Sequence, residues 1–262
     1  MAIDYFKAVQ ELNLLDDVLM TVVFKDDTEL TEFVLKIILN LDLKVTSVKV
    51  QDTLKNLKGR SVRLDIHAIS EDGKHFNIEI QRQDKGAGAK RARYNSSLID
   101  ANTLSEGEDV DDLPETYVIF ITERDVLKLN EPIYFIERMI VGKDKFFNDE
   151  EHIVYVNNSF QDDTPLGRLM HDFSCASPNE MFYREVADKI RPHKEDETEM
   201  IKVAGVMERI KEQAIREQAI DIAKKMIARG KTTLEEIAED LSLPLEKVQE
   251  LAATISPTKN IN

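Results

Sequence analysis

The sequence predicts an α/β protein, in which helices cover a mixed sheet and an all-helical extension follows at the C-terminus. Two alternating segments at residues 60–69 and 75–81 flank a Gly-containing turn, which predicts a β-hairpin. A near-continuous β-branched and aromatic run at residues 116–122 is typical of a strand buried on both faces. An amphipathic pattern over residues 197–229 predicts the long first helix of the extension.

The predicted core follows the order helix, three strands, helix, strand. Residues 28–41 carry an apolar stripe at helical spacing, and residues 45–50 alternate as a strand ahead of the hairpin. A helix at about residues 85–104 then joins the hairpin to the 116–122 strand. Because a helical crossover joins parallel strands, the second hairpin strand and the 116–122 strand should be parallel, which makes the sheet mixed.

The chain beyond this core is predicted to add a strand and several helices. A change in composition at residues 191–197 predicts a boundary between a domain at 1–192 and a helical tail at 193–262. Within the tail, Gly230 ends the long helix and two short helices follow in a helix-turn-helix outline. The further strand is expected at residues 153–156, and the short helices at residues 132–140, 178–190, 235–240 and 244–252.

Composition indicates a folded protein of a reducing compartment. The 262 residues are 42% hydrophobic and 32% charged, which excludes wholesale disorder. The single cysteine, Cys175, rules out a disulfide within the chain. The N-terminus lacks a basic region followed by an apolar stretch, and no apolar run is long enough to span a bilayer. We therefore expect a cytoplasmic protein that makes no membrane contact.

The net charge of −15 bears on nucleic-acid binding. Affinity for phosphates comes mainly from Lys and Arg, so an acidic chain is expected to show weak, salt-sensitive binding to nucleic acid. A local basic stripe can still suffice.

The register of the hairpin can be deduced from burial. If residues 71–73 form a three-residue loop with Gly73 left-handed, six apolar residues share one face. A two-residue turn would shift the pairing by one and mix the faces, which burial disfavours. The apolar pairs are then Leu64 with Ile80, Ile66 with Ile78, and Ala68 with Phe76; the polar pairs are Asp65 with Glu79, Arg63 with Gln81, and His67 with Asn77.

Two carboxylates thus meet across the strand pair, Asp65 opposite Glu79. Like charges directly opposite are destabilising, and a divalent cation between them would remove that cost. Hard oxygen ligands suit Mg²⁺ or Mn²⁺. The alternative interpretation is that both acids simply occupy a solvent-facing strand surface.

Four ordered stretches carry a resemblance to a known family. Residues 59–65, 76–82, 90–94 and 113–122 resemble the PD-(D/E)XK nuclease superfamily, and within it the recombination-promoting nuclease / putative transposase family. The similarity covers roughly residues 14–190. It implies a restriction-endonuclease-like core and a metal-dependent DNA endonuclease that promotes recombination or transposition-like strand breakage.

The resemblance also implies roles for individual residues. Asp65 and Glu79 would ligate Mg²⁺ (or Mn²⁺), with the carbonyl of Ile80 as a third oxygen. Gln81 stands where the superfamily often has a catalytic lysine; an amide can orient water or a phosphate oxygen but cannot neutralise developing charge. The missing positive charge must then come from the metal or from a neighbour such as Arg63, Arg82 or Lys90.

The superfamily often places an acid on its first helix, for which Glu29 is the first candidate and Glu32 the second. A solvated acid favoured by the helix dipole is the alternative interpretation.

DNA contacts are expected from a basic cluster beside the hairpin. Gly86 and Gly88 would let the backbone approach a phosphate, and Tyr94 could stack on a base or sit at the edge of the core. The second short helix of the tail carries more acid than base, so a protein contact or a homo-oligomer contact is favoured there over DNA reading. The basic residues of the DNA surface are Arg63, Lys85, Lys90, Arg91 and Arg93.

Two functions therefore compete. The facing carboxylates favour an endonuclease, whereas Gln81 and the net charge favour a catalytically weak or inactive nuclease fold that binds DNA or protein.

Overall fold

The computed structural model describes residues 5–56, 59–82 and 86–255. Its contacts divide the chain into two compact units, one ending at Ala204 and the other beginning at Gly205. This division comes later in the chain than the boundary expected at 192/193, because the helix that crosses 192/193 packs within the first unit. There the ammonium of Lys194 donates hydrogen bonds to the carbonyls of Val9, Gln10 and Leu12. Within the described ranges, no helix is long and apolar enough to cross a membrane.

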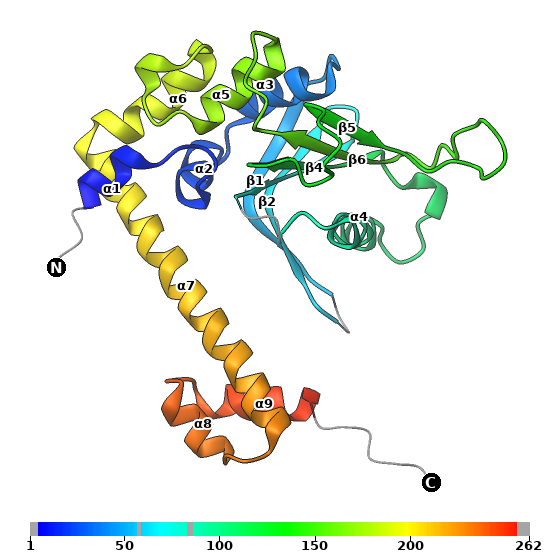
Figure 1. The fold of residues 1–262 in the computed structure, drawn as a ribbon. Helices are drawn as coiled ribbons and strands as arrows, with labels where there is room; N and C mark the ends of the chain where they lie inside the picture. Colours follow the sequence, from blue (N-terminus) through cyan, green and yellow to red (C-terminus); the bar gives the residue numbers. More distant parts are fainter. Residues whose placement is uncertain (1–4, 57–58, 83–85, 256–262) are drawn as a thin grey trace. The chain divides into compact units, whose positions relative to one another are not determined.

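The first unit is built on a six-stranded mixed sheet with the order β1-β2-β3-β4-β6-β5 (Figure 1). β3, β4 and β6 are parallel neighbours, whereas β1–β2, β2–β3 and β5–β6 pair antiparallel. This confirms the predicted α/β class and the parallel crossover. The strands are β1 (Val45–Leu54), β2 (Val62–Ser70), β3 (His75–Gln81), β4 (Thr116–Thr122), β5 (Ile133–Ile136) and β6 (Glu151–Asn157).

Helices cover both faces of this sheet. The sequence reading identified α3 and the crossover helix α4 but missed α1, α2 and α5, which are short segments without a long apolar period. The segment predicted as a helix at 178–190 is a 3₁₀ turn, Pro178–Glu180, followed by α6. The helices are α1 (Tyr5–Glu11), α2 (Asp17–Val23), α3 (Thr28–Leu39), α4 (Ala89–Thr103), α5 (Pro165–Ser174) and α6 (Arg184–Glu195).

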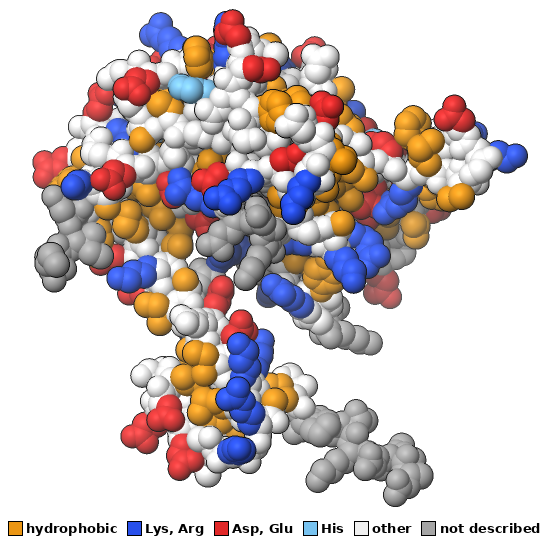
Figure 2. All heavy atoms as spheres, viewed as in Figure 1, with side chains coloured by type: hydrophobic (Ala, Val, Ile, Leu, Met, Phe, Trp, Pro, Cys, Tyr) orange, Lys and Arg blue, Asp and Glu red, His pale blue; other side chains and the backbone are white. Residues whose placement is uncertain are grey.

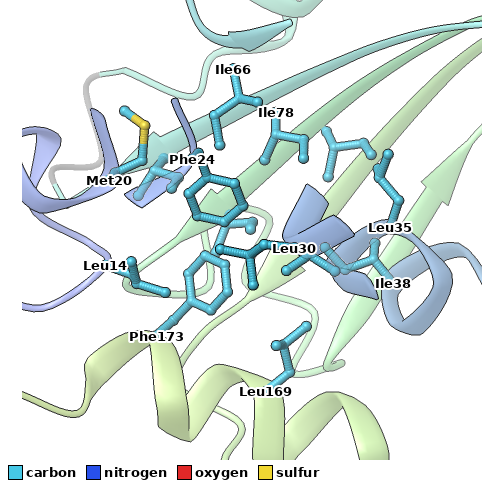
Figure 3. Close-up of a cluster of buried hydrophobic side chains, with 14 of the residues drawn as sticks. Leu14, Met20, Phe24, Leu30, Leu35, Ile38, Ile66, Ile78, Leu169 and Phe173 are labelled. Carbon is cyan, nitrogen blue, oxygen red and sulfur yellow. The ribbon is translucent and has the colours of Figure 1, made fainter. Parts of the chain in front are cut away.

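The larger core lies between one face of the sheet and helices α2, α3, α5 and α6 (Figure 3). Phe24 and Phe173 lie in it with ring centroids 6.3 Å apart, and Ile66 and Ile78 reach it from the sheet. A smaller core on the other face joins α4 to the sheet through Ala92 and Phe120. Helix α4 therefore covers the second face of the sheet, which is the face that carries Glu79.

The predicted hairpin register is confirmed over its apolar half. Ile66 pairs with Ile78 and Ala68 with Phe76, and Gly73 has a φ of 85° in the turn. The assignment of Leu64 to the same apolar face is wrong, because Leu64 packs with Leu98 and Ile99 of α4.

The helix predicted at residues 132–140 is also wrong. Ile133–Ile136 form the edge strand β5, which pairs with β6, and the chain then continues as a projecting hairpin closed by a Met139–Phe146 bridge. The pairing partner lies some twenty residues further along the chain, so a local pattern could not reveal it.

The second unit contains the end of α7 (Glu197–Arg229), α8 (Leu234–Asp240) and α9 (Leu245–Ile255), which confirms the predicted helices of the tail. Its own small core includes Ala223, Ile237 and Leu251. Thr233 and Glu236 form a capping box at the start of α8.

Candidate active site

The regular pairing of the sheet is interrupted at Asp65. The β2–β3 ladder runs from Ile69–His75 to Ile66–Ile78 and stops there. The carboxylate of Asp65 then accepts the backbone N–H of Ile80 at 3.0 Å. On the other side, Gln51 would face Asp65, but it adopts a left-handed φ of 54° and the β1–β2 ladder omits it. The side chain of Asp65 therefore replaces backbone pairing where the strands part.

The carboxyl groups of Asp65 and Glu79 are buried close together. Asp65 is 9% exposed and Glu79 is fully buried. Burial, and next the negative charge of Glu79, raise the pKa of Asp65 to about 8. Burial likewise raises the pKa of Glu79, and the positive charge of Arg91 opposes this rise. The two acids therefore share a low-dielectric site that disfavours two negative charges at once.

Arg91 is the cation that contacts this pair. Its Nη2 lies 2.5 Å from Oε2 of Glu79. The other carboxylate oxygen, Oε1, is buried with no hydrogen-bond partner among the described residues. The arginine expected to bind phosphate thus contacts the buried acid from the first turn of α4, while its side chain stays 40% exposed.

Two buried amides, which the sequence reading did not single out, extend the polar site beneath α4. Arg91 and Asn95 are one helical turn apart, about 6 Å, and Glu79 and Asn77 are two strand residues apart, about 6.6 Å. The two spacings are similar, so Asn95 is on the same side of α4 as Arg91, and Asn77 is on the same face of β3 as Glu79. Both amides are buried, and neither makes a well-formed hydrogen bond to another described residue. The Asn77 amide nevertheless lies close enough to the Glu79 carboxylate to lower its pKa. Buried polar groups of this kind are usually satisfied by ordered water.

The donor set fits a hard divalent cation. The two carboxylates, including the free Oε1 of Glu79, offer oxygen ligands, and a cation would stabilise the charged forms that burial disfavours. In the described part of the chain, no group of three or more His, Cys, Asp or Glu side chains is arranged to hold a metal. Such an ion would therefore complete its shell with water and substrate oxygens, as Mg²⁺ commonly does.

The first-helix acid predicted at Glu29 lies elsewhere. Glu29 is exposed and pairs with Lys189 at 3.3 Å, and Glu32 pairs with Lys36 and accepts the N–H of Val45. The helix acid whose charge raises the pKa of Asp65, though less than burial and Glu79 do, is Asp17 at the start of α2.

Asp17 was missed because α2 is too short to show a helical period in the sequence. It is open to solvent, yet enough protein surrounds it for desolvation to raise its pKa, against the nearby positive charge of Arg63. Acidic Asp16–Asp17 ahead of the apolar Val18 and Leu19 was the signal that could have located it.

Gln81 is held against the loop that follows its strand. A Cβ added to Gly86 would lie 1.6 Å from Oε1 of Gln81, so the amide occupies the space that any side chain at 86 would fill. Nothing lies within 4 Å of the corresponding point on Gly88. Gly86 therefore accommodates Gln81, in place of the phosphate approach expected for it.

The remaining predicted DNA contacts on α4 differ in whether their side chains are free to reach DNA. Lys90 and Arg93 are exposed on α4, and among the described residues neither makes an ion pair. Tyr94 accepts a hydrogen bond from Asn56 at 3.1 Å and donates to the carbonyl of Arg60, so it links α4 to residues between β1 and β2. Lys85 lies outside the described residues.

Arg63 and Arg82 lie on the Asp17 side of the site. Arg63 is exposed and its charge lowers the pKa of Asp17. Arg82 pairs with Asp16 at 3.0 Å and donates to Asn13 at 2.8 Å. Arg82 is therefore engaged, whereas Arg63 remains accessible.

The raised pKa of Asp65 predicts the pH dependence of stability without metal. Its carboxyl keeps a proton when folded that it releases when unfolded, so the free energy of unfolding should fall as pH rises from about 4 to about 8. Asp65→Asn should remove most of this fall, measured by chemical denaturation in a chelator at several pH values.

A matched control is Asp42→Asn, since Asp42 is fully exposed. The variant comparison is needed because burial lowers the pKa of His75 to about 4, which makes stability rise with pH up to about 6.5. Equal pH slopes for wild type and Asp65→Asn would contradict the assignment.

Comparison with known proteins identifies the family. The family model described as PD-(D/E)XK nuclease family transposase matches residues 25–236, which include both Asp65 and Glu79. No curated protein and no solved structure matches the chain. Because the matched segment spans most of the sequence and agrees with the mixed α/β fold, the chain belongs to the PD-(D/E)XK nuclease family transposases.

Proposed function

We propose that this protein is a metal-dependent DNA endonuclease that hydrolyses phosphodiester bonds and so promotes recombination or transposition-like strand breakage. The observation that carries the proposal is the buried Asp65–Glu79 pair, with its raised pKa values and an unpartnered carboxylate oxygen. Two such acids side by side are costly in a purely structural role. They are suited to a cation, and the family supplies the reaction class.

In this proposal Asp65 and Glu79 hold Mg²⁺ or Mn²⁺, and the carbonyl of Ile80 supplies a further oxygen. When bound, the cation activates a water molecule and polarises the scissile phosphate. The N–H of Ile80 fixes the Asp65 carboxylate in one orientation. Gln81, seated over Gly86, orients water or a phosphate oxygen by hydrogen bonding.

Arg91 supplies the positive charge that Gln81 cannot. Its contact with Glu79 places a guanidinium beside the carboxylate pair, and its side chain is 40% exposed, so it can also face a substrate. A planar guanidinium can bind a carboxylate and a phosphate oxygen through different N–H groups. Arg82, expected as an alternative, is engaged by Asp16 and Asn13.

The DNA backbone is proposed to follow the exposed basic residues Lys90 and Arg93 of α4, with Arg63 on the adjacent strand. These residues supply local positive charge in a chain of net charge −15. The few phosphate contacts predict modest affinity that falls as the salt concentration rises.

A second candidate is a catalytically weak or inactive nuclease fold that binds DNA or protein. Gln81 in place of lysine favours it, and so does the Arg91–Glu79 contact, which satisfies half of the carboxylate without any metal. A homo-oligomer through the C-terminal helices is compatible with either function.

Plasmid nicking tests the endonuclease directly. Wild type should convert supercoiled plasmid to nicked or linear DNA with Mg²⁺ or Mn²⁺ but not with chelator, and Asp65→Ala and Glu79→Ala should abolish this. Asp42→Ala, a matched acid on the surface, should cleave like wild type. Cleavage by Asp65→Ala at the wild-type rate would reject the site, and DNA binding without cleavage by wild type would support the second candidate.

The packing of Gln81 on Gly86 predicts a paired effect. Gly86→Ala should displace the Gln81 amide and lower the cleavage rate about as much as Gln81→Ala, on the order of 10²-fold for a lost positioning group. Gly88→Ala, where a methyl group meets nothing within 4 Å, should be close to wild type. If Gly86→Ala and Gly88→Ala cleave equally well, Gln81 has no positioning role.

The basic residues of α4 are predicted to separate into two kinds. Lys90→Ala with Arg93→Ala should weaken DNA binding for all sequences and reduce the salt slope by about two. Arg91→Ala should affect DNA binding less than this pair does, but should lower the cleavage rate and shift the pH–rate profile to higher pH, because loss of its charge raises the pKa of Glu79 further. Lys247→Ala in the tail is the neutral control. If Arg91→Ala reduces the salt slope as much as the Lys90/Arg93 pair and leaves the pH–rate profile unchanged, Arg91 acts in DNA binding and not on Glu79.

A further inference from the structure

The hairpin between β5 and β6, residues 137–149, is called the arm here. The backbone N–H of Phe147 donates to the carbonyl of Arg138 at 2.9 Å, and Ile140 donates to Lys145 at 3.0 Å. Gly142 turns the chain at its tip with a φ of 77°. The arm projects beyond the edge of the sheet (Figure 1). It is therefore an ordered two-stranded extension of β5 and β6.

The arm and β5 present an unusual amount of apolar surface to solvent. Val141, at the tip, is 99% exposed. Orange side chains lie on the projecting arm in Figure 2. With residue surfaces of roughly 150–250 Å², the set exposes on the order of 700 Å², beyond the largest patch of a typical monomer and close to one side of a standard interface. Its members are Phe135, Ile136, Met139, Ile140, Val141, Phe146 and Phe147.

The patch continues into an unpaired strand edge. β5 is the last strand of the sheet, and its outer side has no neighbouring strand among the described residues. An exposed edge strand with apolar side chains is a template for pairing with another chain. The charge of this region is balanced, since residues 133–149 contain three acidic and three basic residues, although the chain has a net charge of −15. This balance favours a second copy of the same chain as the partner.

A neutral, apolar patch is the part of this surface where two copies can approach without strong repulsion. It also lies away from the proposed DNA site: the arm leaves the sheet beyond the Ile136–Ile153 pair, whereas Glu79 and Gln81 lie toward the other ends of the parallel strands. A DNA contact would need excess basic charge, which the arm lacks.

We propose that the arm and the outer edge of β5 bind the same elements of a second copy of this chain, related by a two-fold axis. Antiparallel pairing of an edge strand with itself satisfies the backbone groups of both copies. The apolar side chains of each arm are then covered by the other. One self-complementary patch serves both partners, as a two-fold interface requires.

Sedimentation equilibrium of the full chain tests this inference. Wild type should be dimeric in the micromolar range, and Val141→Asp with Phe147→Asp should weaken dimerisation by at least about 100-fold, because four like charges then meet at one interface. The melting temperature of the variant, taken at a concentration where wild type is monomeric, should be unchanged. Ile215→Asp, an exposed apolar residue on α7, should remain dimeric.

Cross-linking locates the contact independently. In a Cys175→Ser background, Val141→Cys should cross-link between copies with a short bis-maleimide, whereas Leu129→Cys, equally apolar and 67% exposed but outside the arm, should not. A wild-type monomer at about 50 µM would overturn the proposal. Dimers lost in Ile215→Asp but kept in the arm variant would overturn it too, as would an arm variant that stays dimeric and loses DNA binding.

Discussion

The hydrogen bond from the Ile80 N–H to the Asp65 carboxylate is the constraint on which the candidate site depends. Where β2 and β3 part, a backbone donor would otherwise be left unpaired in a buried place, at a cost of about 1–3 kcal/mol. The Asp65 carboxylate accepts the hydrogen bond of this donor, so a backbone group, and not a basic side chain, holds the acid against the sheet. The same interruption brings Leu64 to α4 while Ile66 stays in the larger core.

Helix α4 supplies the other half of the arrangement. Arg91 of this helix contacts Glu79 of β3, and Asn95, one turn further on, shares its side of the helix. The result is a polar layer beneath a helix that otherwise packs through Ala92 and its apolar neighbours. A buried carboxylate with one paired oxygen and one free oxygen keeps its charge partly compensated while leaving a ligand position. This partly compensated carboxylate needs side chains from both α4 and β3, and neither element would create it alone.

The hairpin register was accessible from the sequence because a period of two assigns every residue to a face, and a shift by one exposes the whole apolar set. Ile66–Ile78 and Ala68–Phe76 followed from that rule alone. The rule assumes an unbroken ladder, and it failed for Leu64, beyond the break at Asp65. The sequence points to Glu29 because its helix is the first one with a visible apolar period; α2, which carries Asp17, has only seven residues and leaves too short a pattern.

The sequence by itself determined the α/β class, the mixed sheet, the identity of Asp65 and Glu79 as neighbouring acids, and the helices of the tail. These features depend on local periodicity and on pairing between adjacent segments. The tertiary structure decided that Arg91 contacts Glu79, that Asp17 is the nearby acid, that Gln81 rests on Gly86, and that residues 133–136 join β6. Each of these depends on how elements distant along the chain are placed in space, and residue spacing within one segment carries no information about that placement.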